Sequence, residues 1–380
     1  MARSSRSHTH EGPARRRDHP RRSAHPRSHV RRAPAASRDR RPPARSAGGG
    51  RAHGDRPPLA SCPEPALEHG ARAGDLRHLV SALQPDVVHL HSFFPGVLGR
   101  MRSLPGDPRV VYQPHSWAFD AVSNEALARA VARWERHAAT GTDVTVTNCQ
   151  EELAEARTRR VDGNAMVIGL PVDVDFFRPG DPSAARAALG IDAARVITCV
   201  GRLSRQKNQE QLAAAWEAAP IPDTVLALVG PGSQDAVRAA APTTADRSLR
   251  LVGPTDDVRT WLQASDIAVL PSLYEGQSVS MAEALSCGVP VVMTQVNGAS
   301  EMVAPVGEAP AGAVVPVGAM RELLAECATR LADPPRMAAE GVAARRRAVT
   351  HFRAETVMAR LLEAYTPHPD PVLQRESQRP

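Results

Sequence analysis

The stretch IAVLPSLYEGQSVSMAEALSCGVPVVMT, from Ile267 to Thr294, decides the fold, because it reads as strand, loop, helix and strand. Apolar runs at 267–270 and 291–293 predict the two strands, and the residues between 278 and 286 predict the helix. A strand that feeds a helix through a Gly-containing loop directs backbone N–H groups and the positive end of the helix at one point. The stretch therefore predicts an anion site.

The start of this helix carries two hydroxyls and two carboxylates. Ser278 or Ser280 can cap the helix. Ser280 and Glu283 also match the S-x-x-E capping box, in which Glu283 would reach back to a backbone N–H. Glu275 lies in the loop just before the helix. The sequence leaves both a capping role and a ligand role open for Glu283.

The same alternation of strands and helices runs through most of the chain. Strands are predicted at 86–91, 110–112, 144–147, 166–170, 196–200, 225–229, 249–252, 267–270, 291–293 and 313–317. Helices are predicted at 71–83, 124–137, 151–158, 183–189, 209–217, 234–241, 256–264, 278–286, 319–331 and 354–365. This pattern predicts an α/β protein with two Rossmann-like, doubly wound domains that face a cleft.

Composition divides the chain further. We expect an Arg/Pro-rich disordered segment at 1–57, a partial N-terminal Rossmann-like domain at 58–180 and a C-terminal Rossmann-like domain at 181–350. A helix at 351–366 is expected to return to the N-terminal domain, and 367–380 reads as a polar tail.

The net charge of +6 is concentrated in the first segment, since residues 1–57 hold 16 Arg against four acids and the remainder is net negative. Almost without aliphatic residues, this segment cannot offset the entropy cost of ordering. Three interpretations stay open: sequence that is not native coding sequence, an inert tail, or an arm that binds polyanions. The segment has no aromatic residue for base stacking, and we expect no nucleic-acid partner.

The cysteines and the hydropathy indicate a reducing compartment. Five cysteines are far apart and form no CxxC, which argues against a disulfide framework or a cysteine metal site. No apolar run of about 18 residues predicts a membrane span. We therefore expect a cytoplasmic protein, either free or in peripheral contact with the inner face of the membrane.

The loop after strand 196–200 concentrates cations at the active end of the second predicted sheet. It begins at Gly201, and its residues Arg202 and Lys207 can clamp a diphosphate, Arg through its fork and Lys as a point charge. Lys207 is the single lysine of the chain, which favours a chemical role for it. Arg205 reads instead as a solvated loop residue.

Three histidines follow strands in the first half of the chain. His89 and His91 are two residues apart, so both can face one side, but no third metal ligand with a suitable spacing follows. His115 lies in a loop after strand 110–112. It can contact a ligand in the cleft or only bond a loop carbonyl, and spacing alone does not choose between the two.

Together, GRLSRQKN at 201–208 and EGQSVSMAEALSCGVPVV at 275–292 resemble the C-terminal domain of the family-4 retaining glycosyltransferases, which have the GT-B fold. Glu275 and Glu283 match the E-x7-E motif of that family. The resemblance covers about residues 72–366 and is strongest from 196 to 303. It departs from the family at the N-terminus, where the Arg-rich segment replaces a strand and Gly-rich loop, and at Leu170-Pro171, which replace Asn-Gly.

The resemblance implies a nucleotide-diphosphate sugar as co-substrate, with no metal and no other cofactor. Arg202 and Lys207, in the loop that Gly201 opens, would hold the diphosphate and do the work of a metal at the leaving group. The site residues that it implies are, for catalysis, Glu275 at the donor sugar and His115 on the opposite wall and, for donor binding, Gly201, Arg202, Lys207, Gly276, Gln277, Ser278 and Glu283, the last at the ribose.

The sequence thus predicts a retaining, hexosyltransferase-type glycosyltransferase that acts on an unidentified glycan, lipid or small-molecule acceptor. The main alternative is a nucleotide-binding remnant that no longer transfers sugar, because about three βα units of the family's N-terminal sheet find no counterpart here. A sugar-nucleotide epimerase of the same fold is a further alternative, against which the E-x7-E motif argues.

Overall fold

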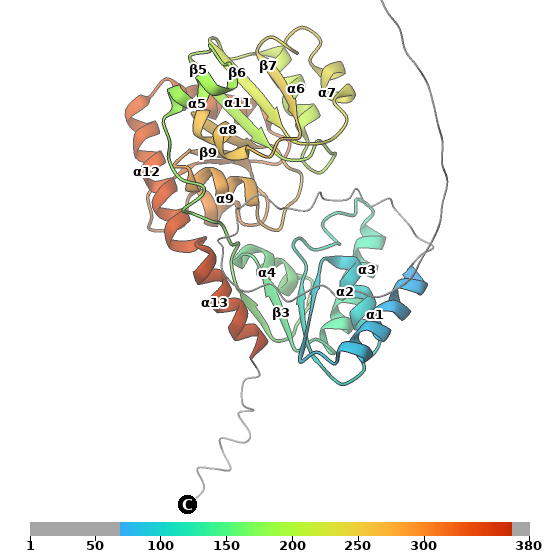
Figure 1. Ribbon diagram of the computed structural model, residues 1–380. Helices are drawn as coiled ribbons and strands as arrows, with labels where there is room; N and C mark the ends of the chain where they lie inside the picture. Colours follow the sequence, from blue (N-terminus) through green and yellow to red (C-terminus); the bar gives the residue numbers. More distant parts are fainter. Residues whose placement is uncertain (1–68, 367–380) are drawn as a thin grey trace, which may run out of the picture. The chain divides into compact units, whose positions relative to one another are not determined.

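In a computed structural model, the chain is described over residues 69–366, where helices alternate with strands of two parallel sheets (Figure 1). The predictions made for 1–57, for 58–68 and for 367–380 lie outside the described residues.

The first sheet has four parallel strands in the order β1-β2-β3-β4. The strands are β1 (Val87–His91), β2 (Arg109–Gln113), β3 (Val144–Thr147) and β4 (Ala165–Val167). The helices along this part of the chain are α1 (His69–Leu83), α2 (Phe93–Arg100), α3 (Glu125–Ala139) and α4 (Gln150–Thr158). Val111 and Val146 are fully buried in this sheet, as expected for β-branched residues of parallel strands that are covered on both faces.

The second sheet has six parallel strands in the order β10-β9-β8-β5-β6-β7. The strands are β5 (Arg195–Val200), β6 (Thr224–Val229), β7 (Leu249–Gly253), β8 (Ile267–Leu270), β9 (Val291–Thr294) and β10 (Gly312–Val315). The accompanying helices are α5 (Pro182–Leu189), α6 (Gln209–Ala218), α7 (Asp235–Ala240), α8 (Val258–Ala264), α9 (Val279–Ser286), α10 (Ala299–Val303) and α11 (Met320–Leu331). The strand order reverses between β5 and β8, so the switch point where doubly wound sheets bind ligands lies between these two strands.

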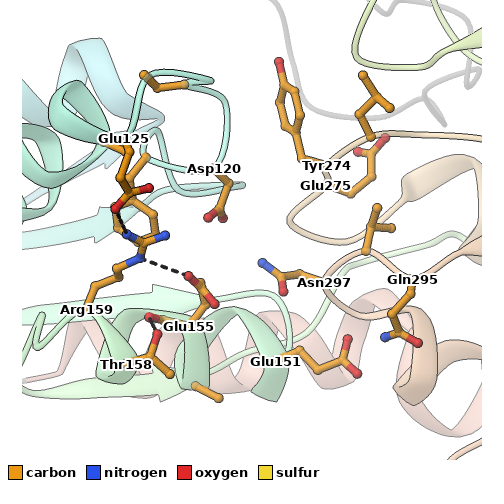
Figure 2. Close-up of a pocket in the computed structure, with 16 residues that line it drawn as sticks. Asp120, Glu125, Glu151, Glu155, Thr158, Arg159, Tyr274, Glu275, Gln295 and Asn297 are labelled. Atoms are coloured by element: carbon orange, nitrogen blue, oxygen red, sulfur yellow. Dashed lines mark hydrogen bonds and ion pairs between the residues drawn. The ribbon is translucent and has the colours of Figure 1, made fainter. Parts of the chain in front are cut away.

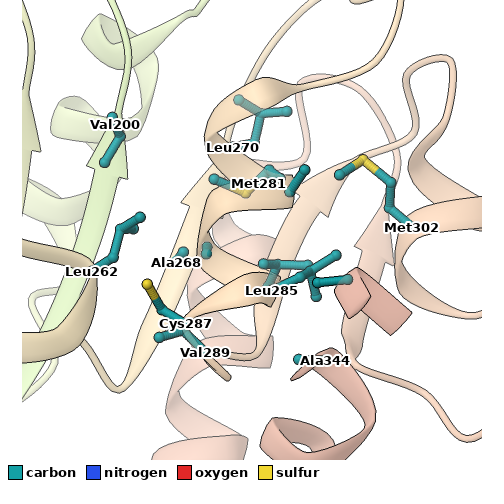
Figure 3. Packing of buried hydrophobic residues seen from close by; sticks show 14 of the residues in the cluster. Val200, Leu262, Ala268, Leu270, Met281, Leu285, Cys287, Val289, Met302 and Ala344 are labelled. Carbon is teal, nitrogen blue, oxygen red and sulfur yellow. The ribbon is translucent and has the colours of Figure 1, made fainter. Parts of the chain in front are cut away.

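The main core of the second sheet lies around α9, as Figure 3 shows. Met281 and Leu285 of α9 are fully buried beside Leu270 of β8 and Ala344 of α12 (Pro334–His351). Each fully buried side chain of this size stabilises the fold by roughly 1.5–3 kcal/mol. The helix that follows the anion loop is therefore fixed by packing on two sides.

Helix α13 (Ala354–Tyr365) packs on the first sheet, beside β3 and α4 in Figure 1. Ala364 is buried with Val111 and Val146, and its carbonyl accepts a hydrogen bond of 2.8 Å from Arg109 Nε. Helix α13, at the C-terminal end of the described residues, thus covers the four-stranded sheet of the N-terminal half.

The structure confirms the predicted parallel α/β organisation and corrects several elements. Helices α2, α10 and α12 were not predicted, because α2 contains a proline and two glycines, α10 has five residues, and α12 begins with two prolines. The predicted strand 166–170 is too long: β4 ends at Val167, and Gly169 turns the chain with φ of 90°. No described helix is long and apolar enough to cross a membrane.

Candidate functional site

An ion pair lies across the switch point of the six-stranded sheet. Lys207, which follows β5, places its Nζ 2.6 Å from Oε1 of Glu275, which follows β8. Ser272 Oγ donates a 2.7 Å hydrogen bond to the same carboxylate oxygen. Both charged side chains are largely buried, with 19% and 8% of their surfaces exposed. The structure therefore brings together the single lysine and the first glutamate of E-x7-E.

Hydrogen bonds and a close backbone approach hold the loops around this pair. Leu273 N donates to Gln206 O at 2.8 Å, and Gln206 Nε2 donates to Tyr274 O at 3.1 Å. Gly230, after β6, has φ of 148°, and a Cβ there would lie 2.2 Å from Gly201 O. Only glycine fits this close approach, so the loop that begins at Gly201 depends on it.

Arg202 and Arg205 lie in the same loop as Lys207, and both side chains are exposed. Gln209 Nε2 donates to the Arg202 carbonyl at 3.0 Å, which fixes the Arg202 backbone. Within the described residues, the Arg202 guanidinium forms no ion pair. The structure thus leaves the Arg202 charge open to an anionic ligand.

The capping-box interpretation of Ser280 and Glu283 is wrong, because the N-cap of α9 is Ser278 and Ser280 is already the second helical residue. The Ser278 side chain does not cap the helix either, and its Oγ instead lies 3.2 Å from Ser280 Oγ. Glu283 is a buried residue in the interior of α9. The side chain of Gln277 is also buried, and its Oε1 has no hydrogen-bond partner within the described residues.

His89, His91 and His115 form a row on the first sheet. The rings of His89 and His91 stack with centroids 3.9 Å apart, and His91 Nδ1 lies 2.8 Å from His115 Nε2. His89 Nδ1 lies 2.8 Å from Tyr365 Oη. Partial burial lowers the pKa of His89 and of His115 to about 4, with repulsion by His91 adding to the shift of both. Partial burial lowers the pKa of His91 as well, so all three rings favour the uncharged form. Sequence spacing gave no sign that His115 joins the pair.

The His115 backbone meets the loop of Glu275. His115 has φ of 59°, and a Cβ on Gly276 would lie 2.5 Å from the carbonyl C and O of His115. From the other side, Cys149 Sγ donates to Gly276 O at 3.1 Å. Two loops of the first sheet, those after β2 and β3, therefore contact Gly276 in the loop after β8 of the second sheet.

A cavity of about 590 Å³ lies beside this contact, between α3, α4 and the loops that follow β8 and β9 (Figure 2). Of the predicted site residues, only Glu275 lines it. Its other acidic lining residues are Asp120, Glu125, Glu151 and Glu155. Arg159 is the basic residue of this lining and lies 3.3 Å from Glu155 and 3.8 Å from Glu125.

Asp120 lines this cavity and has one carboxylate oxygen that accepts no hydrogen bond within the described residues. Its Oδ2 is buried without a hydrogen-bond partner among the described residues, and burial, with repulsion by Glu155, raises the pKa of Asp120 to about 7. Sequence reasoning missed Asp120 and Arg159, because Asp120 lies in an irregular loop and Arg159 ends an ordinary polar helix.

Metal ligation finds no support in the part of the chain that the structure describes. No group of three or more His, Cys, Asp or Glu side chains in residues 69–366 could hold a metal ion. The four cysteines of this range are free and buried, and burial raises the pKa of each thiol.

Two family models match the chain. The model described as "Glycosyl transferases group 1" matches residues 194–333, and the model "Glycosyltransferase Family 4" matches residues 13–176. The second match begins inside the Arg-rich segment, for which the sequence left three interpretations open.

Curated relatives and solved structures agree with these matches. The chain is 34% identical over 229 residues to the UDP-Gal:alpha-D-GlcNAc-diphosphoundecaprenol alpha-1,3-galactosyltransferase of Escherichia coli, covering 56% of this chain and 58% of that protein. It is 31% identical over 328 residues to a D-inositol 3-phosphate glycosyltransferase of Segniliparus rotundus, covering 77% of this chain and 69% of that protein. A sucrose-phosphate synthase structure from Thermosynechococcus elongatus superposes with a TM-score of 0.70 at 23% identity, over 81% of this chain and 80% of that one, which is a likeness of fold.

Proposed function

Because this chain belongs to the family-4 glycosyltransferases, which have the GT-B fold, we propose that it transfers a sugar from a nucleotide-diphosphate sugar to an acceptor. The observation that carries the proposal is the Lys207–Glu275 pair at the switch point between β5 and β8. An ammonium group and a carboxylate at this point suit the two parts of such a donor, since the diphosphate is anionic and the sugar offers hydroxyl donors.

The proposed roles follow from the charges and positions of the residues. Lys207 and the exposed Arg202 neutralise the diphosphate, and they stabilise the charge that develops on the leaving nucleotide without a metal ion. Glu275 accepts hydrogen bonds from the donor sugar, beside the backbone of Gly276 and the start of α9. Glu283 accepts from the ribose hydroxyls.

The finer features of the reaction are proposals from the family and from the relatives' names. We propose that transfer retains the anomeric configuration and that His115 lies near the sugar on the opposite wall. A UDP-sugar is the first donor to test, because the Escherichia coli relative is named for UDP-Gal. That relative is also named for a diphosphoundecaprenol acceptor, and a lipid acceptor would bring the protein into peripheral contact with a membrane.

The test uses the purified chain with UDP- and GDP-sugars and a panel of glycan, lipid and inositol phosphate acceptors. Proton NMR of the product reads the anomeric configuration through the coupling at the anomeric proton. We expect transfer with retention from one donor class. Unchanged activity in both Lys207→Ala and Glu275→Ala would contradict the site, and an inverted product would contradict retention.

The second candidate is nucleotide binding without transfer. Its supporting observation is that the described part of the first sheet has four strands, whereas the second sheet has six. It predicts that calorimetry detects UDP or GDP binding that depends on Lys207, while no acceptor in the panel receives sugar. Measurable transfer rejects it.

A further inference from the structure

The imidazole ring of His115 is bonded through one of its two nitrogens. Its Nε2 lies 2.8 Å from Nδ1 of His91. His91 ends β1 and lies opposite Gln113, the last residue of β2, so His115 comes beside it two residues farther along the chain. Within residues 69–366, no hydrogen bond reaches Nδ1 of His115. The contact therefore leaves one nitrogen of the ring held and the other open to a ligand.

The relative orientation of these two rings is that of a hydrogen bond. Their planes are inclined by 14°, and their centroids are 5.1 Å apart. An imidazole nitrogen lies about 1.1 Å from the centre of its ring, so two rings that meet edge to edge across the 2.8 Å contact have their centroids at about the observed separation. The lone pair of such a nitrogen lies in the plane of the ring. His91 Nδ1 and His115 Nε2 therefore share one in-plane N–H···N bond.

The His91 ring is itself held on its other side. His89 and His91 are two residues apart in β1, so their side chains leave the same face of the sheet. Their rings stack with centroids 3.9 Å apart. His89 Nδ1 in turn lies 2.8 Å from Tyr365 Oη at the end of α13, and these two rings meet edge-on. The row thus anchors the His91 ring to β1 and to α13.

A separate contact fixes the backbone of His115. Its φ of 59° is in the left-handed region, which costs an L-residue free energy and persists only where surrounding contacts over-determine it. The His115 carbonyl lies against Gly276, where a Cβ would be 2.5 Å away. The Gly276 contact thus fixes the point from which the His115 side chain starts, and the His91 bond fixes how its ring is turned.

We propose that His91 is a positioning residue that holds the His115 ring through Nε2 and so presents Nδ1 of His115 to the donor sugar. The inference rests on the proposed function for the identity of the ligand. The hold of His91 on the ring is a property of the free protein, and it can be measured without turnover.

The shared bond also couples the tautomers of the two rings. A neutral imidazole carries one N–H, so either His91 Nδ1 donates to His115 Nε2 or the reverse holds. In the first case Nδ1 of His115 carries a proton and donates to the ligand, and in the second it accepts from the ligand. Which nitrogen of a histidine is protonated is set by the hydrogen bond that the other makes. The bond therefore selects one tautomer of His115 as well as the orientation of its ring.

The first experiment records ring ¹⁵N NMR spectra of the free, histidine-labelled protein at pH 8. A ring held in one tautomer shows two well-separated nitrogen resonances, whereas exchange between tautomers averages them. We expect separated resonances for His91 and His115 in the wild type, with a through-bond coupling between His91 Nδ1 and His115 Nε2. Averaged resonances without this coupling would overturn the proposal, and this measurement needs no variant beyond those that assign the signals.

A substitution then tests whether His91 is the group that holds the ring. In His91→Leu the two His115 resonances should move toward each other, because the ring loses its partner. His91 is exposed, so the substitution leaves the core intact. His78→Asn is the matched control, since His78 is an exposed histidine of α1, and it should leave the His115 resonances where they are. His115 resonances that stay separated in His91→Leu would refute the hold.

A ligand titration identifies the nitrogen that meets the sugar. We expect UDP-galactose, UDP-glucose or GDP-mannose to shift the Nδ1 resonance of His115 more than the Nε2 resonance, and UDP alone to shift neither. A larger shift at Nε2 would contradict the assignment of Nδ1. If no sugar nucleotide shifts either resonance, the contact of His115 with the donor fails, while the spectra of the free protein still decide the role of His91.

The second experiment measures transfer in three variants of His91. Asn places a carboxamide atom as many bonds from Cβ as Nδ1 of histidine, whereas Gln places it nearer to Nε2 and Leu offers no hydrogen bond. We expect kcat to fall about tenfold or more in His91→Leu and His91→Gln, as for a misplaced reacting group, and to stay within about threefold of wild type in His91→Asn. UDP affinity should change less than threefold in all three.

The pattern of rescue decides between positioning and a general structural role. An equal loss of kcat in His91→Asn and His91→Leu, or an unchanged kcat in His91→Leu, would refute positioning through Nδ1. A wild-type protein that transfers no sugar to any acceptor would refute the proposed function, and the ring spectra would still decide whether His91 holds His115.

Discussion

Lys207 Nζ lies 2.6 Å from Glu275 Oε1, although 68 residues separate the two in the chain. The loops after β5 and β8 flank the point where the strand order reverses, and one backbone hydrogen bond and one bond from the Gln206 side chain hold them together. An anion that enters here meets an ammonium group already oriented by a carboxylate, which reduces the entropy cost of binding. The pair is thus a preformed part of the proposed donor site.

The first prediction separates nucleotide binding from turnover at this pair. Lys207→Met should weaken UDP binding about tenfold or more, and it should lower transfer about 100-fold, because both the ground state and the leaving group lose a cation. Glu275→Gln should lower transfer comparably but keep most of the UDP affinity, since its proposed contact is with the sugar. Calorimetry and initial rates measure the two effects.

Arg205→Ala is the matched control for this prediction, because Arg205 is an exposed cation of the same loop. It should leave UDP affinity within about threefold of wild type, as expected for a solvent-screened surface charge. A loss in Arg205→Ala as large as that in Lys207→Met would mean that the loop attracts nucleotides only through its overall charge.

The second prediction concerns the contact between His115 and Gly276. In Gly276→Ala the new Cβ would lie 2.5 Å from the His115 carbonyl, so one of the two loops must move. Overpacking of this kind costs about 1–3 kcal/mol, and transfer should fall while UDP affinity changes little. Gly141→Ala is the control, because its Cβ would have 4.0 Å of clearance. Equal stability of the two variants in urea would contradict the contact.

The third prediction uses the raised pKa of Asp120, about 7, against an ordinary value near 4 in the unfolded chain. A carboxyl with a raised folded pKa favours the folded state in its protonated form, and that contribution is lost as pH rises from about 4 through about 7. Asp120→Asn should therefore melt at a higher temperature than wild type at pH 8 and at a similar temperature at pH 4. An equal shift at both pH values would exclude titration of Asp120 as the cause.

Much of the fold could be predicted from the sequence, because buried parallel strands and amphipathic helices leave strong local patterns. Strands β3 and β8 begin and end at the predicted residues, as does α13. Helix α2 could not be predicted, because Pro95 and two glycines mask its pattern. Gly96 and Gly99 lie where a Cβ would be 2.4 Å from Tyr112 and 2.5 Å from Leu90, so tertiary packing selects them.

The parts of the candidate site that follow adjacent strands of one doubly wound sheet could be predicted from the sequence. The parts that depend on irregular loops or on contacts between the two sheets could not. Lys207 and Glu275 each follow a strand of one sheet, and the doubly wound order brings their loops together. The row from His89 to His115 and the acidic cavity at Asp120 depend instead on irregular loops and on cross-sheet contacts. Residue spacing carries no information about such contacts.

The last prediction concerns two helices that cap each other between the sheets. Glu151, in the first turn of α4, accepts a 2.6 Å hydrogen bond from Gly298 N, the N-cap of α10. Glu301, in the first turn of α10, accepts a 2.8 Å bond from Glu151 N. Each carboxylate thus satisfies a backbone N–H of the other helix start, where a negative charge is favourable.

Glu151→Gln and Glu301→Gln should each destabilise the protein by about 1 kcal/mol, the usual cost of losing a helix cap. Because the two bonds share one contact, the double variant should show a coupling energy of about 0.5 kcal/mol or more in urea unfolding. Glu155→Gln tests the specificity of the effect, since Glu155 lies on α4 and its ion pair within residues 69–366 is with the partly exposed Arg159. Additive effects of the two substitutions would show that each carboxylate acts within its own half of the chain. A coupled loss with a larger radius of gyration in solution scattering would show that the reciprocal caps hold the two sheets together.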